Sequence, residues 1–200
     1  MKIYDLTRTL SHETEVYPGD PPFVCSAMMR LPGDVCNLSR AEMCLHTGTH
    51  ADAPLHFIAD GAAIDVLPAE HFAGRAYVAA IKPENGIIRT SAVREALTHL
   101  DGERILVIYT GHESFDSIPV FESEIGALLA SCGIITLASD LPSAEPAAVM
   151  HRDLLGRGIV IIEALTGLGS LPADRIFLSA APLKIKDGDG APLRALAFVM

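Results

Sequence analysis

The sequence has little positive charge and no long apolar run. It contains 15 Lys and Arg residues against 25 Asp and Glu residues, which gives a net charge of −10. This balance argues against nucleic-acid binding, because that function selects for basic faces. No apolar stretch approaches the roughly 20 residues of a membrane span, and the first residues lack the apolar core of a signal peptide. We therefore expect a cytoplasmic protein that binds neither nucleic acid nor membrane.

Cysteine and the common catalytic motifs are also scarce. The four cysteines, Cys25, Cys36, Cys44 and Cys132, form no Cys-x-x-Cys pair, so no zinc ribbon or redox motif is indicated and we expect four reduced, buried thiols. Cys44 lies two residues before His46 and could serve as a ligand, although packing in the core is the simpler interpretation. The sequence has no Gly-x-Ser-x-Gly elbow, phosphate-binding loop or His-Glu-x-x-His helix.

The chain is long enough for one domain with a full core, and we assign residues 1–200 to a single domain. Aliphatic runs predict strands at 77–81, 105–109, 134–138, 159–165, 176–181 and 193–199. Helical spacing of apolar residues predicts helices at 91–100 and 121–132, and a short one at 151–155. Strands that alternate with helices imply parallel pairing. The predicted class is α/β with a mixed sheet.

The most informative segment is His46-Thr47-Gly48-Thr49-His50-Ala51-Asp52-Ala53-Pro54-Leu55-His56. Its three histidines and its aspartate all occupy even positions, so in an extended backbone they share one face. Two imidazoles and a carboxylate that converge make a transition-metal site, and His56 is then a further ligand or a base. A purely structural cluster would be costly, because each buried imidazole needs partners for its ring nitrogens.

Two downstream residues are candidates for the rest of the site. His151 opens the predicted short helix, and Glu163 lies within the apolar strand 159–165. A carboxylate in such a strand is rarely buried without a charged partner or a metal, and an exposed edge position is the alternative. Asp140 follows strand 134–138 at the end where open α/β sheets place functional groups, but we prefer to interpret it as a cap or turn residue before Pro142.

These residues resemble the cyclase and metal-dependent hydrolase family, which includes bacterial kynurenine formamidases. The segment 46–56 matches the family pattern His-x-Gly-Thr-His-x-Asp-x-Pro-x-His. Further matches are Asp5-Leu6-Thr7, Tyr17-Pro18-Gly19-Asp20, His151 followed by Glu163, and the closing segments 181–185 and 189–194. The resemblance extends over nearly the whole chain. It is highly specific for the family and weak for the substrate.

The resemblance implies roles for individual residues. His46, His50 and Asp52 would bind a first metal, and Asp52 would bridge to a second metal completed by His151 and Glu163. His56 would be the acid/base residue. The ions would be zinc, with manganese as the alternative. The resemblance further implies a swivelling β/β/α fold and a homodimer or homotetramer.

The implied reaction is hydrolysis of an N-formyl arylamine such as N-formylkynurenine, a step of tryptophan catabolism, with metal-activated water as the nucleophile. The family has Trp before Pro-Gly-Asp to pack on the substrate ring, and this chain has Tyr17 there, which can still stack. One alternative is a ring-opening hydrolase or cyclase that acts on a lactam or lactone such as isatin. The other is a non-catalytic metal protein, although a structural site needs only four ligands.

Overall fold

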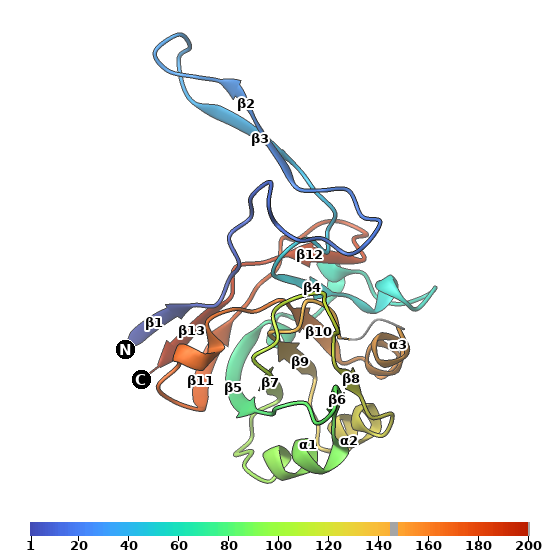
Figure 1. Ribbon diagram of the computed structural model, residues 1–200. Helices are drawn as coiled ribbons and strands as arrows, with labels where there is room; N and C mark the ends of the chain where they lie inside the picture. Colours follow the sequence, from blue (N-terminus) through green and yellow to red (C-terminus); the bar gives the residue numbers. More distant parts are fainter. Residues whose placement is uncertain (145–147, 200) are drawn as a thin grey trace.

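A large mixed sheet forms the centre of the molecule (Figure 1). The computed structural model describes residues 1–144 and 148–199. Within them, one sheet has the strand order β1-β13-β11-β5-β7-β9-β10-β4-β12. In that order the strands are Lys2–Asp5, Leu196–Val199, Arg175–Ser179, Ala73–Ala80, Ile105–Tyr109, Thr136–Ser139, Val160–Glu163, His50–Asp52 and Gly190–Pro192. The neighbours β5, β7, β9 and β10 are parallel, and antiparallel strands flank them on both sides.

In residues 1–144 and 148–199, three α-helices lie on one side of this sheet (Figure 1). They are α1 (Thr90–Leu97), α2 (Ile125–Ser131) and α3 (Val149–Gly156). A small parallel pair, β6 (Ile87–Ile88) and β8 (Val120–Phe121), lies beside them. Short 3₁₀ turns span Pro54–His56, Ile64–Val66, Ala69–His71 and Leu168–Ser170. None of the helices in the described part of the chain is both long enough and apolar enough to span a membrane.

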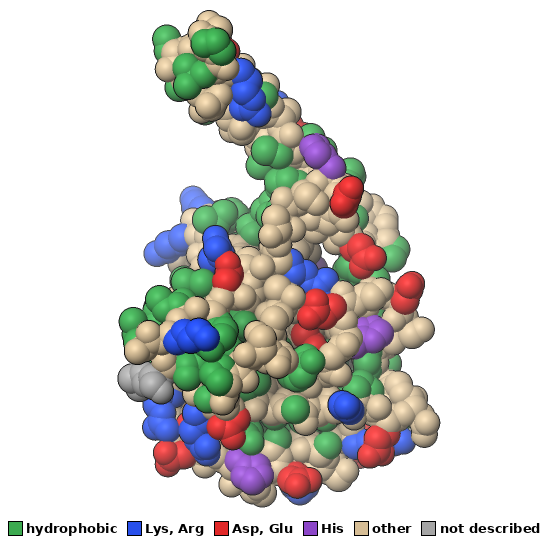
Figure 2. Space-filling model, turned by 60° about the vertical axis from the view of Figure 1, so that its left-hand side comes forward, with side chains coloured by type: hydrophobic (Ala, Val, Ile, Leu, Met, Phe, Trp, Pro, Cys, Tyr) green, Lys and Arg blue, Asp and Glu red, His purple; other side chains and the backbone are tan. Residues whose placement is uncertain are grey.

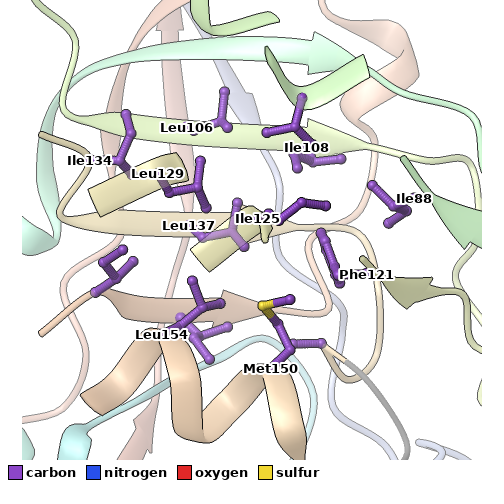
Figure 3. Close-up of a cluster of buried hydrophobic side chains, with 14 of the residues drawn as sticks. Ile88, Leu106, Ile108, Phe121, Ile125, Leu129, Ile134, Leu137, Met150 and Leu154 are labelled. Atoms are coloured by element: carbon purple, nitrogen blue, oxygen red, sulfur yellow. The ribbon is translucent and has the colours of Figure 1, made fainter. Parts of the chain in front are cut away.

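The centre of the sheet is buried on both faces, which explains the unbroken aliphatic run Ile105–Ile108 in β7. In β7, Leu106 and Ile108 belong to the core on the helical side, and Ile105 and Val107 belong to the core on the opposite side. Figure 3 shows Leu106 and Ile108 in one cluster with Ile125 and Leu129 of α2 and with Met150 and Leu154 of α3. A strand with two buried faces has no polar alternation, so the aliphatic run 105–109 predicted β7 correctly.

Several predicted boundaries were wrong. The helix predicted at 121–132 begins at Ile125, because Val120–Phe121 instead pairs with Ile87–Ile88 as β8. The helix predicted at 91–100 ends at Leu97. The strand predicted at 193–199 begins at Leu196, because Leu193 instead forms an isolated bridge with Pro182. The residues just before it, Gly190–Pro192, form a separate strand, β12, at the other edge of the sheet.

The segment 46–56 is not one extended strand, as its alternation predicted. Only His50–Asp52 is a strand, His46 lies in a turn, and Pro54–His56 forms a 3₁₀ turn. Gly48 has a φ of +67°, and a Cβ there would lie 2.5 Å from the side chain of Leu10. The glycine therefore serves a tight turn that packs against Leu10.

A long hairpin, which we call the arm, projects away from the body of the molecule (Figures 1 and 2). It comprises β2 (Val24–Met29), β3 (Leu38–Glu42) and the residues between them, and nearly all of them are exposed. The prediction of four buried thiols was wrong here. The four cysteines are free, but Cys25 and Cys36 are exposed on the arm, Cys132 is exposed after α2, and Cys44 is partly buried.

Candidate active site

Sheet register brings the predicted ligands together. Strands β4 and β10 are antiparallel neighbours, and their register places His50 opposite Glu163. His50 and Asp52 point to the side of the sheet that α3 covers, whereas Ala51 between them belongs to the opposite core. His151 projects from α3 toward the same place. His50, Asp52, His151 and Glu163 are all at most 4% exposed, so Glu163 is a buried carboxylate and not an edge residue.

Asp52 and Glu163 contact both buried imidazoles. His50 Nε2 lies 3.2 Å from Asp52 Oδ1 and 3.4 Å from Glu163 Oε2. His151 Nε2 lies 3.0 Å from Glu163 Oε1 and 3.7 Å from Asp52 Oδ2. On the far side of the His50 ring, Nδ1 lies 2.8 Å from the carbonyl oxygen of Gly48. A hydrogen bond donated from Nδ1 leaves Nε2 as the atom directed at the carboxylates.

A second group of residues, His46, His56 and Asp189, lies beside Asp52. His46 Nδ1 is 2.8 Å from Asp52 Oδ1, and the His46 ring stacks on His56 with centroids 3.8 Å apart. Asp189 Oδ2 lies 3.0 Å from His46 Nε2 and 3.3 Å from His56 Nδ1. The structure thus brings the other five predicted metal and acid/base residues around Asp52.

The ligand atoms fall into two sets with a shared member. The atoms of His50, Asp52 and Glu163 lie within 4.8 Å of one another, and so do those of His46, Asp52 and His56. Asp52 belongs to both sets, as expected of a bridging carboxylate. The resemblance implied that His50 shares a metal with His46 and that His56 is the acid/base residue and not a ligand. In the structure His50 instead groups with Glu163, and a ring nitrogen of His56 belongs to the same set as one of His46.

The electrostatics of the site favour added positive charge. Burial by itself would lower the pKa of His46, but the hydrogen bond and charge of Asp52 raise it to about 9. The pKa of His50 is likewise raised against its burial by Asp52. Burial would raise the pKa of Asp52, yet His46 and His50 hold it well below its usual range. Burial lowers the pKa of His56, which keeps its imidazole neutral near pH 7.

The donor set fits a divalent metal. Asp52 Oδ2 is buried and accepts no hydrogen bond from the described residues. Within the same residues, Asp52 and Glu163 form ion pairs with histidines alone and not with Lys or Arg. Buried carboxylates need a cationic partner. Imidazoles and carboxylates together are ligands for zinc and manganese.

The cluster opens into a pocket of about 540 Å³. Its aromatic walls are Tyr17, Phe57 and Phe115, and the five predicted ligands and His56 line its base. Tyr17 is 44% exposed and meets Phe115 edge to face, with ring centroids 6.2 Å apart. The pocket therefore offers aromatic walls next to the polar cluster, which suits an aromatic ligand with one polar group.

Sequence reasoning missed Asp189 and Gly190. Residues 186–190, Lys-Asp-Gly-Asp-Gly, have the composition of a plain turn, yet Asp189 contacts both His46 and His56. A Cβ on Gly190 would lie 2.6 Å from His46 Cε1 and 2.7 Å from the carbonyl oxygen of Ala51. A sequence motif cannot indicate these contacts, because the partners are more than 130 residues apart in the chain. Their only signal was the Asp189–Arg194 match to the family.

Asp140 is fully buried and acts on a neighbouring loop. Its carboxylate accepts hydrogen bonds from the backbone and hydroxyl of Thr110 and from the backbone of Gly111. It therefore orders the loop that follows β7, and not the turn before Pro142 that we expected. Asp140 does not line the aromatic pocket.

Comparisons with known proteins agree with this architecture. A family model described as "Putative cyclase" matches residues 4–146. A kynurenine formamidase of Salinibacter ruber is 36% identical over 98% of this chain and 97% of its own. A second kynurenine formamidase, of Polaromonas naphthalenivorans, is 31% identical over 98% of this chain and 90% of its own.

Solved structures show the same fold. A potential metal-dependent hydrolase with cyclase activity is 28% identical and superposes with a TM-score of 0.80 over 98% of this chain and 96% of its own. Isatin hydrolase A from Labrenzia aggregata is 26% identical, with a TM-score of 0.81 over 98% of this chain and 93% of its own. These values confirm the α/β fold with a mixed sheet that the sequence predicted.

Proposed function

The chain belongs to the cyclase family, and from this we propose that it is a metal-dependent amidohydrolase of N-formyl arylamines, with N-formylkynurenine as the leading substrate. One observation carries the proposal: a buried cluster of His, Asp and Glu lies at the base of an aromatic pocket. The similarity to kynurenine formamidases over nearly the whole chain supports the choice of substrate.

The metal-binding residues in this proposal are His46, His50, Asp52, His151 and Glu163, which would hold one or two divalent cations. A bound cation would polarise the amide carbonyl and lower the pKa of a water molecule to near neutrality. Zinc suits this mixture of imidazoles and carboxylates best, and manganese comes next. Asp52 is the member shared by both sets of ligand atoms.

His56 and the aromatic walls supply the remaining functions. In the reaction, the oxygen of water joins the formyl carbon, the C–N bond breaks, and the arylamine nitrogen takes up a proton as formate leaves. The neutral His56 accepts the proton from water and returns it to the leaving nitrogen. Asp189, 3.3 Å from His56 Nδ1, orients this imidazole. Tyr17, Phe57 and Phe115 offer a surface for the aryl ring.

Hydrolysis of N-formylkynurenine by zinc-reloaded protein tests the proposal directly. Turnover is followed by absorbance, and a chelator-treated sample serves as the control. His50→Ala should lose metal and activity together, because Nε2 of His50 faces both buried carboxylates. Protein that holds zinc stoichiometrically but does not turn over this substrate would refute the assignment.

A second candidate reaction is the opening of a lactam or lactone ring. The structural similarity to isatin hydrolase A, at 26% identity, favours it. The higher identity to the formamidases, 36% and 31%, ranks it second. Isatin offered to the same zinc-loaded protein separates the two reactions.

A non-catalytic structural metal site is the remaining alternative. The cluster exceeds the four ligands that such a site needs, and it opens into a pocket. Chelation distinguishes the cases, because a structural site should lose its fold with its metal. We expect the circular dichroism spectrum to survive chelation while activity is lost.

We also propose that the protein assembles as a homodimer or homotetramer through the arm. A two-stranded hairpin alone is marginally stable in water, and this one exposes Met28, Leu31, Val35 and Leu38 by 50% or more. Such an apolar surface is typical of an interface. Light scattering should give a dimer or tetramer, and Val35→Ser should weaken it. The matched control is Val66→Ser, because Val66 is also an exposed valine but lies on the body of the molecule. A monomeric wild-type protein would refute the proposal.

We further propose that the protein acts in tryptophan catabolism and is located in the cytoplasm. The four free cysteines, three of them exposed, are suited to a reducing compartment. Cell fractionation with an antibody tests the location, and recovery of the protein outside the cytoplasmic fraction would contradict it.

A further inference from the structure

A second cavity, of about 570 Å³, borders the aromatic pocket. The two share His46, Phe115 and Pro142 as lining residues, so a ligand in one can extend into the other. The character of the second cavity is different, because its other walls are mostly charged or hydroxylated. Both signs of charge are present, since Arg8 lines the cavity together with Glu13, Glu15 and Glu113. Figure 2 shows a hollow between the base of the arm and the body, where basic and acidic side chains meet.

Arg8 is held rigidly but without a counter-charge. Its Nη1 donates to the carbonyl oxygen of Glu113 at 2.8 Å, and its Nη2 donates to that of Asp140 at 3.2 Å. Its backbone N–H donates to Thr49 Oγ1 at 2.9 Å. Among the described residues, no carboxylate forms an ion pair with Arg8. Each Nη atom carries two hydrogens, so each retains one N–H that neither carbonyl uses.

The setting of Arg8 suits recognition of a carboxylate. A guanidinium presents paired N–H donors in the geometry that a carboxylate accepts. Two backbone carbonyls hold the group in place, one from the loop after β7 and one from the end of β9. Little side-chain entropy is then lost when a ligand binds. The glutamates of the same cavity would oppose a simple anion and favour a ligand that also carries a cation.

We propose that this cavity, the head-group subsite, binds the zwitterionic head of an α-amino acid, with the carboxylate on Arg8 and the ammonium among Glu13, Glu15 and Glu113. The inference rests on the proposed function, whose formamide lies in the adjoining pocket. It narrows the substrate class to N-formyl arylamines that carry an amino-acid side chain. A neutral bicyclic lactam has no charge to place here, so the subsite also separates the two candidate reactions.

Two substrates that differ only in the head test the proposal. N-Formylkynurenine carries the amino-acid head, and 2-formamidoacetophenone has the same ring and formamide without it. Wild-type zinc protein should prefer the first in kcat/KM. Arg8→Met should reduce this preference about 10- to 100-fold, as expected for a lost hydrogen bond to a charged group. The preference is a ratio within one protein sample, so partial loss of folded protein cancels.

Two further variants separate recognition from support of the loops. Arg8→Lys keeps the charge and should retain part of the preference. Arg104→Met also removes an arginine that donates to a backbone carbonyl, that of Gly133, but it lies outside both cavities, so it should keep the full preference. An unchanged preference in Arg8→Met, or equal use of the two substrates by the wild type, would overturn the head-group subsite.

Binding of L-kynurenine, the expected product, gives a readout that needs no turnover. By calorimetry, Arg8→Met should weaken its binding about tenfold or more and leave 2-aminoacetophenone unaffected. If the metal-loaded protein hydrolyses neither formamide, the proposed function fails while this measurement still decides the subsite. Equal binding of L-kynurenine by wild type and Arg8→Met would refute it.

Discussion

Gly190→Ala is the change whose effect on the site can be worked out most directly. Gly190 lies in β12, paired with Asp52 of β4. A Cβ at this position would lie 2.6 Å from His46 Cε1 and 2.7 Å from the carbonyl oxygen of Ala51, well inside the 3.4 Å of an ordinary contact. The carbonyl belongs to a strand that is hydrogen-bonded on both sides, so it has little freedom to move. The methyl group must therefore displace the imidazole of His46.

The magnitude follows from overpacking and from the loss of ligand geometry. Forcing one extra methyl into a packed site costs about 2 kcal/mol, which for a chain of this length lowers Tm by roughly 4–8 °C. Displacing His46 also breaks its 2.8 Å contact with Asp52. Altered partners of a metal ligand cost about 10- to 100-fold in metal affinity. We expect losses of both stability and zinc.

Gly74→Ala is the matched control. Gly74 lies in β5 of the same sheet, where a Cβ would make an ordinary 3.6 Å contact with Ile105. Replacing a strand glycine with alanine should be neutral or slightly stabilising. Thermal unfolding and zinc titration of the two variants measure the difference. A Gly190→Ala protein with wild-type Tm and zinc affinity would show that His46 does not occupy the site as described.

Three other changes test single residues. His56→Ala should keep its zinc and lose about 10²- to 10⁴-fold in kcat; normal turnover would exclude the acid/base role. Asp52→Asn should lose zinc, measured by elemental analysis, because it removes the carboxylate shared by both ligand sets. Glu103→Gln should destabilise the fold by about 1 kcal/mol at pH 7. Burial raises the pKa of Glu103, but backbone hydrogen bonds and Arg75 produce a net lowering. The ionised Glu103 carboxylate therefore stabilises the fold at pH values above its unfolded pKa of about 4.3, and this stabilisation is lost as the pH falls through its folded pKa. Urea titrations of wild type and Glu103→Gln measure it; a difference between the two that persists at pH 2 would contradict this.

The cluster of candidate ligands could be predicted from the sequence because most of it is local. His46, His50, Asp52 and His56 lie within one short segment, so one or two local turns are enough to bring them together. The predicted reason was nevertheless wrong, since only His50–Asp52 is extended. A turn and a 3₁₀ turn bring the outer two histidines back to the same place. The closeness of these residues in the sequence therefore predicted the cluster correctly, whereas their alternating positions predicted the wrong backbone conformation.

The walls of the site could not be predicted because they depend on distant contacts. Asp189 reaches His46 across 143 positions, and Arg8 reaches the carbonyl of Asp140 across 132. Neither side chain belongs to a pattern with a helical or strand period. The arm was missed for a related reason. Its strands have no buried face, so their sequence lacks the alternation that marks half-buried strands.

The geometry of the site depends on β4, a strand of only three residues. Strand β4 lies between β10 and β12, and its Asp52 is opposite Ile161 on one side and Gly190 on the other. Since successive side chains alternate between faces, a slip of one residue would turn Asp52 into the apolar core and Ala51 into the site. Ala51 and Ala53 are packed in that core, which has no partner for a carboxylate. These small apolar residues of the 46–56 segment therefore fix the register of β4, and with it the direction in which the candidate ligands His50 and Asp52 point.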